Sequence, residues 1–456
     1  MKDVLRNAFR NVDVEYGDVR VEETVRTSIV YHGQEPVAAA SSSEVGGCLR
    51  VFRRGNWGVS SFNAPERDLR RLARETADPL ELLPARHESI QGLPAADEEL
   101  TVKPEHDVRR VVLEEKHRLL THYNDVLLAQ PGVTSTRAVY ADRFTRCYFY
   151  SSENRFISQE RVSAALDLTA IARDGTNVRS YSGSFGKPKG FSTLLGLESE
   201  VENIARTARE LLTAEPVAAG VYTVVIDPLL AGLFAHEAFG HLAEADFTSR
   251  NERLRELTRF GARLGFDELA IVDDGTMPFE PGSSVYDDEG TPTSKTYLLK
   301  NGRVSGQLHS RQTAHRLEGH LTGNGRALSY RHPPIVRMTN TYIEPRRSTL
   351  DEMLAGIENG LYVAGMAGGT TDLDSFTFGA QYAREIRKGR LGRMLRDVAL
   401  SGNVFETMKS IDAIGNDLVM QGGLNSCCGK ADQLGLPVGM GGPHLRIRNV
   451  VVGGRA

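Results

Sequence analysis

Apolar and polar residues alternate in several stretches of the first third of the chain. Between residues 19 and 31 the apolar side chains mostly share one parity, which is the period-two pattern of a strand with one buried face. They are Val19, Val21, Val25, Ile29 and Tyr31. Residues 46–62 predict two further short strands that turn at 54–56, and strand signals return from about 133 to 172.

Helical periodicity separates these strands. Asn63 is a suitable cap for a helix over 64–77, which carries Leu69, Leu72 and Ala73 on one stripe. Longer helical patterns cover 107–128 and 198–212. Residues 174–190 are rich in Gly and Ser and lack periodicity, so they predict a connecting loop.

The second half of the chain is dominated by strand and turn signals. Residues 220–228 form a mostly apolar, β-branched run, Asn301-Gly302 is a strong hairpin signal, and 444–452 alternate as a strand does. We expect an α+β fold with a boundary near 214–219. The two expected domains are an N-terminal domain of strands and amphipathic helices, 1–214, and a β-rich C-terminal domain that carries a histidine-bearing helix, 219–456.

Composition and charge narrow the range of partners. The 456 residues are 40% hydrophobic and 25% charged, which is ordinary for a globular protein. The 55 basic and 59 acidic residues are well mixed, so no basic surface for nucleic acid is expected. Charges interrupt the N-terminal segment, and no apolar run approaches the roughly 18 residues of a membrane helix. We therefore expect a cytoplasmic protein without a membrane partner.

The segment HEAFGH, residues 236–241, is the main candidate for chemistry. Asp227 and Pro228 predict the start of a helix that would carry both histidines. In a regular α-helix His236 and His241 would point about 140° apart, which is too far to bind one ion. Gly240 would allow either a one-residue π-bulge or an end to the helix, and either distortion could bring the two imidazoles together.

A catalytic zinc also needs a third protein ligand and a general base. Glu237 is of the residue type that takes a proton from water and returns it to a leaving amine. Glu244, Asp246 and a cysteine of the segment NSCCGKADQ are the candidates for the third ligand. The acids could instead orient the imidazoles or lie at a solvated helix end, the cysteines could be small buried apolar residues, and the histidines could be plain helix residues. Spacing alone does not choose.

The chain resembles the TldD branch of the TldD/TldE (PmbA) family of zinc metallopeptidases. The resemblance spans nearly the whole chain and rests on motifs that occur in the family's order. They include ASSSEVGGCLRVF, HEAFGHLAEADF, YDDEGTPTSKTYLLKNGRVSGQL, LTGNGRALSY, GLYVAGMAGG and CCGKADQLGLPVGMGGPHLRIRNVVVGG. The resemblance implies a peptidase whose Zn²⁺ is held by His236, His241 and Cys428, with Glu237 as the catalytic base and Cys427 as a bystander.

The resemblance also implies a partner. Family members pair with a TldE-like paralogue that lacks the zinc motif and enclose a cavity that admits unfolded peptides, so we expect a heterodimer, with a homodimer as the alternative. Two departures bear on the substrate channel rather than on the ligands. They are Asp432, where the family usually has glycine, and the segment TTDLDSFTFGA, 370–380, which lacks a glycine often found before Phe-x-Phe.

Other polar residues could assist the reaction. Donors for a tetrahedral oxyanion could come from His309, His315, His320 or Arg337, although a structural role is the simpler interpretation of each. The acidic turn 287–289 could flank the site, and the glycine turn 322–326 could hold a peptide backbone. A peptide added as a β-strand would suit a β-rich domain.

Three hypotheses about function follow. The leading one is a zinc peptidase that acts on small, unfolded or modified peptides. The second is a zinc amidohydrolase that removes an acyl group from a natural-product intermediate with the same zinc, water and glutamate. The third is a non-catalytic regulator that only binds a partner protein, for which an intact Glu237 would have no use.

Overall fold

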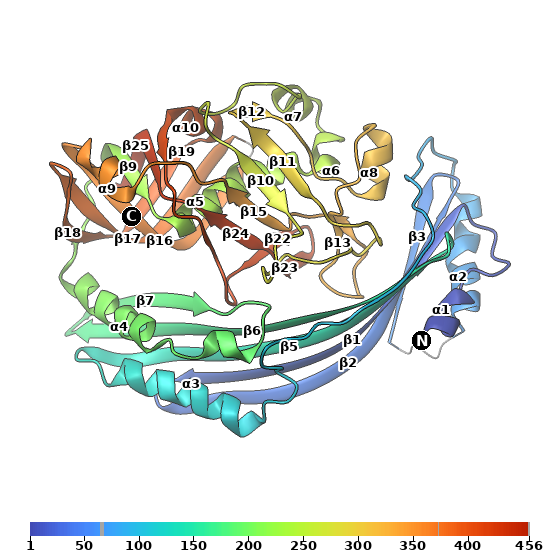
Figure 1. The fold of residues 1–456 in the computed structure, drawn as a ribbon, viewed down its shortest axis with the longest axis horizontal. Coiled ribbons are helices and arrows are strands. Elements are labelled where there is room, and N and C mark those ends of the chain that lie inside the picture. Colours follow the sequence, from blue (N-terminus) through green and yellow to red (C-terminus); the bar gives the residue numbers. More distant parts are fainter. Residues whose placement is uncertain (64–67, 373, 455–456) are drawn as a thin grey trace.

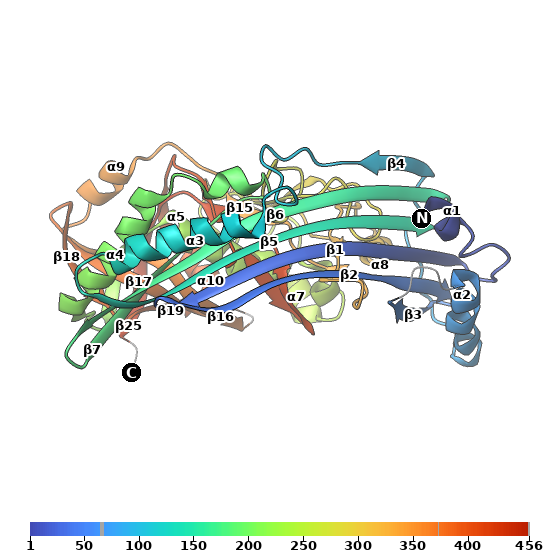
Figure 2. The ribbon, with the colours of Figure 1, turned by 90° about the horizontal axis from the view of Figure 1, so that it is seen from below.

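The computed structural model describes residues 1–63, 68–372 and 374–454. A long, curved sheet is built from the first 185 residues, and the C-terminal half of the chain lies on its concave side (Figure 1). Helices α3 and α4 cover the convex side, as the view in Figure 2 shows. Helices and strands are thus mixed throughout, and the expected α+β class is confirmed.

The curved sheet has the strand order β3-β2-β1-β5-β6, with β4 and β7 both paired to β6. The expected strand over 19–31, the hairpin at 54–56 and the strands over 133–172 are confirmed. The bounds are β1 (Tyr16–His32), β2 (Glu35–Arg53), β3 (Asn56–Phe62), β4 (Ala96–Leu100), β5 (Val133–Ser151), β6 (Arg155–Asp174) and β7 (Asn177–Phe185).

Strand β7 contradicts the loop expected at 174–190. It pairs antiparallel with β6 from Leu166 to Asp174. Its side chains are only partly buried or exposed, so the apolar alternation of a core strand is missing. The side-chain amide of Gln381 accepts a hydrogen bond from the Ser182 N–H (3.0 Å) and donates one to the Ser182 carbonyl (3.2 Å), which occupies the outer edge in place of another strand.

The α-helices of the N-terminal half are α1 (Lys2–Arg6), α2 (Leu69–Ala77), α3 (Leu113–Leu128) and α4 (Glu198–Thr213). Asn63 is not the cap of α2: the Asp68 carboxylate accepts hydrogen bonds from two backbone N–H groups of the first turn, both at 3.1 Å. Residues 64–67, where that helix was expected to begin, lie outside the described residues. Leu69, Leu72 and Ala73 are buried as predicted.

Besides two two-stranded sheets, the described residues of the C-terminal half form two further large sheets. One has the order β16-β9-β25-β19-β17-β18-β8, with β20 beside β25, and the other the order β12-β11-β10-β15-β24-β21. The first comprises β8 (Glu215–Pro216), β9 (Gly220–Ile226), β16 (Asn359–Asp372), β17 (Ser375–Arg387), β18 (Arg390–Arg396), β19 (Val398–Asn403), β20 (Ile411–Ile414) and β25 (Leu445–Gly454). The second comprises β10 (Ile271–Asp274), β11 (Lys295–Lys300), β12 (Arg303–Val304), β15 (Asn340–Ile343), β21 (Val419–Met420) and β24 (Gly439–Gly442).

Helix α5 (Pro228–Ala235) packs between these two sheets, against β24 and β15 on one side and β16 on the other. The predicted hairpin is confirmed, because Asn301 and Gly302 take positive φ values of 50° and 68° and join β11 to β12. The remaining helices are α6 (Ala245–Thr248), α7 (Glu252–Leu257), α8 (Arg311–Arg316), α9 (Leu350–Ala355) and α10 (Val404–Ser410). No helix in the described ranges is long and apolar enough to cross a bilayer.

Candidate metal centre

The segment that carries the two histidines is one continuous helical run from Pro228 to Ala243. The Asp227 carboxylate caps it by accepting a hydrogen bond from the Leu230 N–H (2.9 Å), as the sequence predicts. The run is α-helical to Ala235, widens into a π-helical turn over His236–Gly240 and tightens to a 3-10 turn over His241–Ala243. The π turn contains one residue more than an α-helical turn. This extra residue brings His236 and His241, which are five positions apart, to the same side of the helix.

Gly240 is needed here for lack of a side chain rather than for an unusual backbone. Its φ of −56° is ordinary for a helix. A Cβ at this position would overlap the sulfur of Met338, which is buried against the turn. The close approach of Met338 therefore explains the glycine better than conformational freedom does.

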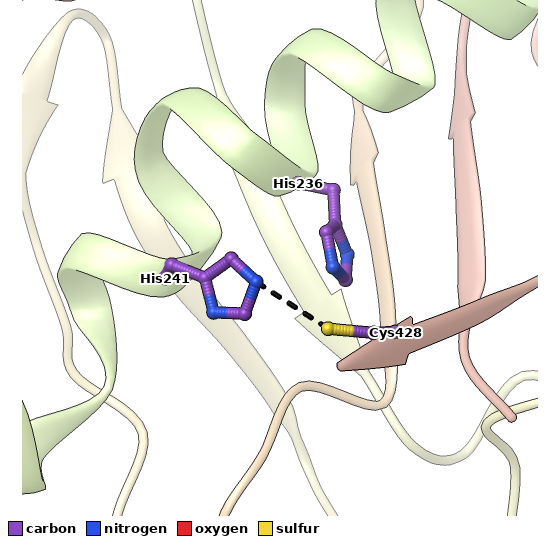
Figure 3. Close-up of side chains that lie close together, drawn as sticks. All are labelled: His236, His241 and Cys428. Carbon is purple, nitrogen blue, oxygen red and sulfur yellow. Dashed lines mark hydrogen bonds between the residues drawn. The ribbon is translucent and has the colours of Figure 1, made fainter. Parts of the chain in front are cut away.

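Three side chains converge beside this turn (Figure 3). One ligand atom from each of His236, His241 and Cys428 lies within 4.8 Å of the other two. His241 Nε2 and Cys428 Sγ are 3.3 Å apart. Cys428 lies on β22 (Cys427–Lys430), which forms a hairpin with β23 (Gln433–Pro437). Adjacent residues of a strand face opposite ways, so Cys427 is exposed and points away.

These residues fit a zinc ion. His236 is 1% exposed, yet neither of its ring nitrogens has a hydrogen-bond partner among the described residues. Two buried ring nitrogens without a partner destabilise the folded state unless a ligand binds them. Two imidazoles and one thiolate form a donor set that suits Zn²⁺. Tetrahedral zinc, with bonds of about 2.0 Å to nitrogen and about 2.3 Å to sulfur, would hold N and S roughly 3.5 Å apart. The observed distance between His241 Nε2 and Cys428 Sγ, 3.3 Å, is close to this value.

The electrostatics of the cluster favour a cation. Burial, together with the nearby His241 and Arg337, lowers the pKa of His236 well below its usual value, so this imidazole is neutral and its lone pair is free. Burial opposes a charge on His241, but the Glu244 carboxylate and the Cys428 sulfur outweigh it and raise the pKa of His241 to about 10. The surroundings of His241 therefore stabilise one positive charge, which a bound metal ion would also supply.

Glu237 is half-buried in the π turn, next to His236 in the sequence. Burial raises the pKa of Glu237, and the positive charge of His241 partly offsets this effect. A carboxylate whose pKa is moved upwards towards neutrality is a better proton acceptor than an exposed one.

Glu244 and Asp246 surround the cluster rather than join it. Glu244 is fully buried, and its Oε2 lies 3.0 Å from His241 Nδ1, so it fixes the orientation of the ring whose Nε2 faces Cys428. Lys430 Nζ lies 3.0 Å from Glu244 Oε2 and 2.7 Å from Asp246 Oδ1. The role considered for the acids as groups that orient an imidazole thus holds for Glu244, and Asp246 binds Lys430.

Lys430 and Met338 are residues that the sequence reasoning missed. Lys430 follows Cys428 on β22, but the pairing with β23 shifts between the two residues, so strand alternation does not predict where its side chain lies. Its contacts with Glu244 and Asp246 show that it lies beside the histidines. Nothing local marks Met338, because its contact with Gly240 depends on distant chain segments.

Among the expected oxyanion donors, Arg337 is the one that contacts the cysteine hairpin. It is fully buried and donates to the carbonyls of Cys428 (2.8 Å) and Gln433 (3.3 Å). His309 is buried and His315 and His320 are exposed, and no hydrogen bond found within the described ranges links these three to the cluster.

The acidic turn and the glycine turn form part of the framework. Asp287 accepts a hydrogen bond from the Gly325 N–H (2.8 Å), and Glu289 accepts one from Arg50 of the curved sheet (3.1 Å). Arg326 is buried and donates to the carbonyls of Met338 and Pro437, the latter at 2.8 Å. The glycine turn is thus engaged with the protein itself, and it supports Met338 and the end of the cysteine hairpin.

Neither departure from the family pattern supplies a side chain of the three-residue cluster. Asp432 is exposed at the turn between β22 and β23. The segment 370–380 covers the turn between β16 and β17, and Leu373 within it lies outside the described residues.

Comparison with known proteins identifies the family. Family models match in three parts: PmbA/TldA metallopeptidase domain 1 (residues 17–78), the central domain (106–214) and the C-terminal domain (219–454). A metalloprotease of Synechocystis is 39% identical over 97% of this chain and 95% of its own, and a zinc metalloprotease TldD homolog of Saccharolobus solfataricus is 28% identical over 96% of both.

The fold is also shared with a solved structure. TldE from Thermococcus kodakarensis superposes with a TM-score of 0.81 and covers all of both chains, at 17% sequence identity. At that identity the likeness concerns the fold alone. The match of all three family models and the full-length relatives lead to one conclusion: this chain belongs to the PmbA/TldD family of metallopeptidases.

Proposed function

We propose that the chain is a zinc-dependent peptidase that hydrolyses amide bonds of small, unfolded or modified peptides. The convergence of His236, His241 and Cys428 beside a helical turn that also carries Glu237 is the observation that supports it best. The names of the relatives, metalloprotease and zinc metalloprotease, agree with this assignment.

In this proposal each residue has a defined task. His236, His241 and Cys428 hold the zinc ion, which when bound polarises the amide carbonyl and lowers the pKa of water. Glu237 accepts the proton of the water that attacks the carbonyl carbon and returns it to the leaving amine. Glu244 keeps His241 in the tautomer whose Nε2 faces the cluster, and Lys430 balances the charge of Glu244.

The division of the chain and its partner belong to the same proposal. Residues 1–214 would supply the curved sheet, and residues 219–456 the catalytic domain. A TldE-like paralogue is the proposed partner, with a homodimer as the alternative, and the shared fold with TldE supports a pseudo-symmetric pair. The proposed location is the cytoplasm.

Hydrolysis of an unstructured fluorogenic peptide tests the activity. The zinc-loaded chain should cleave it, alone or with a TldE-like partner. Glu237→Gln should lower kcat by about 10²-fold to 10⁴-fold, because it removes proton transfer, while zinc content stays unchanged. Cleavage by the variant at the wild-type rate, or no cleavage by the wild type even with the partner, would contradict the proposal.

A further inference from the structure

Three arginines stand side by side on the concave face of the curved sheet. Arg26 on β1 is the direct cross-strand partner of Arg143 on β5, and Arg161 on β6 lies two residues along from the partner of Arg143. All three share the face whose residues contact the C-terminal half, since Arg161 donates to the Ser284 hydroxyl (3.1 Å). Arg26, Arg143 and Arg161 are named the arginine row below.

Like charges opposite each other on a sheet repel, so such a row needs anions. Glu44 is shared between Arg26 (3.0 Å) and the neighbouring Arg331 (3.1 Å). Asp288 lies 3.5 Å from Arg161, and the nearby Glu22 already pairs with Arg20 at 3.0 Å. Each of these three carboxylates therefore pairs with an arginine other than Arg143.

Arg143 is the member without a carboxylate. Within the described residues its guanidinium makes one hydrogen bond, from Nε to the Thr145 hydroxyl (3.1 Å), and no ion pair. Its two terminal nitrogens make no hydrogen bond to any residue that the structure describes, although the side chain is half-buried. Burial and then the positive charge of Arg26 lower the pKa of Arg143, which means that its own charge is poorly compensated.

Arg143 lies on the concave face of the curved sheet, which the C-terminal half contacts. Small side chains that are half-buried or exposed surround it on the concave face: Ala38, Ala40 and Ser42 on β2, Ser28 on β1, Ala141 on β5 and Ser163 on β6. The C-terminal half touches the sheet on either side of this surface. Arg20 donates to the Ser329 carbonyl (2.9 Å) on one side, and Asn425, three residues before Cys428, donates to Asp167 (3.3 Å) on the other.

We propose that Arg143 is a substrate-binding residue that holds a carboxylate of the peptide, with Arg26 and Arg161 strengthening the positive field. This inference rests on the proposed function for the ligand being a peptide. A guanidinium presents two parallel N–H donors that match the two oxygens of a carboxylate. The small side chains on either side would let an extended chain lie on the sheet without steric hindrance. The carboxylate would be either the C-terminal one or that of an acidic side chain.

Binding can be measured apart from hydrolysis. In a full-length, zinc-loaded Glu237→Gln protein, rhodamine-labelled unstructured peptides are compared by fluorescence anisotropy: a free acid without acidic side chains, its C-terminal amide, and an amide with one internal aspartate. We expect at least one carboxylate-bearing peptide to bind about tenfold more tightly than the plain amide, since a charged hydrogen-bonded pair contributes on this scale. The free acid and the aspartate peptide distinguish the two sources of the carboxylate.

Variants of the arginines identify the binding residue. Arg143→Gln should remove the preference for a carboxylate. Arg143→Lys keeps the positive charge but lacks the two parallel N–H donors, so it should retain part of the preference. Arg137→Gln is the matched control, because Arg137 is exposed on the same strand and face and already pairs with Asp167 (3.2 Å). An unchanged preference in Arg143→Gln, or equal binding of all three peptides to the parent protein, overturns the inference while leaving peptide cleavage by the wild type intact. If the wild type cleaves no peptide, the proposed function fails as well.

Discussion

Glu244 is the residue beyond the three proposed ligands on which zinc binding should depend most. Its buried carboxylate orients His241 and is balanced by Lys430. Glu244→Ala should weaken zinc binding by about 10-fold to 100-fold, because the ring would lose its fixed tautomer and orientation. Competition with a chromogenic chelator measures the zinc affinity. Glu256→Gln, an exposed change on α7, is the control, and an affinity in Glu244→Ala equal to the control would refute this role.

His309 should make stability depend on pH. Burial lowers its pKa to about 4, whereas in the unfolded chain the pKa is about 6.5. Below pH 6.5 the unfolded state therefore binds the extra proton, and the free energy of unfolding falls as the pH falls. The loss from this residue between pH 7.5 and pH 5 is roughly 2 kcal/mol.

Denaturant unfolding at several pH values tests this role of His309. In His309→Gln the fall in stability from pH 7.5 to pH 5 should be smaller than in the wild type, by roughly 2 kcal/mol. His315→Gln, which changes an exposed histidine on α8, should keep the wild-type slope. Equal slopes in all three proteins would show that His309 is protonated as easily in the folded state as in the unfolded one.

At the scale of elements, the π turn depends on the contact between Gly240 and Met338. Gly240→Ala should destabilise the protein by about 1 to 3 kcal/mol and reduce zinc binding, because the new methyl group overlaps the Met338 sulfur. In an unconstrained helix the same change would stabilise, since alanine favours helices. Denaturant unfolding and zinc titration measure both effects.

A double variant separates sterics from helix propensity at this turn. Met338→Ala alone should cost about 2 to 5 kcal/mol through loss of buried volume. In the Met338→Ala background the further change Gly240→Ala should cost little or stabilise, so the two effects are not additive. Additive effects would mean that Gly240 is required for its backbone conformation.

Most elements with a buried face could be predicted from the sequence. The strand over β1, the hairpin at Asn301-Gly302 and the cap at Asp227 carry local signals, and the structure confirms them. Strand β2 begins at Glu35, well before the strand expected from residue 46. Its first part was not predicted, because residues 35–43 are exposed on both faces and show no apolar alternation. Strand β7 was missed for a similar reason. The first part of β2 and the whole of β7 are strands because they form hydrogen bonds to neighbouring strands, and local sequence composition does not reveal such bonds.

The same limit applies to the candidate site. Spacing predicted that the helix would have to distort at Gly240 for His236 and His241 to bind one ion, because the angle between the two side chains is a property of a single helix. It could not choose between Glu244, Asp246 and a cysteine, because the choice depends on where the hairpin β22–β23 lies. The resemblance to a family, rather than the spacing, pointed to Cys428, and alternation along the strand then explains why Cys427 faces away.

At the scale of the whole molecule, buried ion pairs join the curved sheet to the C-terminal half. Arg50 pairs with Asp18 within the sheet (2.5 Å) and with Glu289 of the acidic turn (3.1 Å). Arg50→Met should lower the free energy of unfolding by about 3 to 5 kcal/mol, because two carboxylates stay buried without their partner. Arg71→Met, which breaks an exposed pair with Glu75, should cost less than about 0.5 kcal/mol. Similar losses in both variants would contradict a role for Arg50 in joining the two halves.

In the proposed site, one metal ion joins the helix that carries His236 and His241 to the cysteine hairpin. Elemental analysis of wild type, Cys428→Ser and Cys427→Ser, all purified alike without added zinc, tests this proposal. We expect near-stoichiometric zinc in the wild type and in Cys427→Ser, and a clear loss in Cys428→Ser, because Cys428 is the cysteine of the pair that lies beside His236 and His241. Equal zinc in the two cysteine variants, or no zinc in the wild type even after reconstitution with zinc and a TldE-like partner, would contradict it.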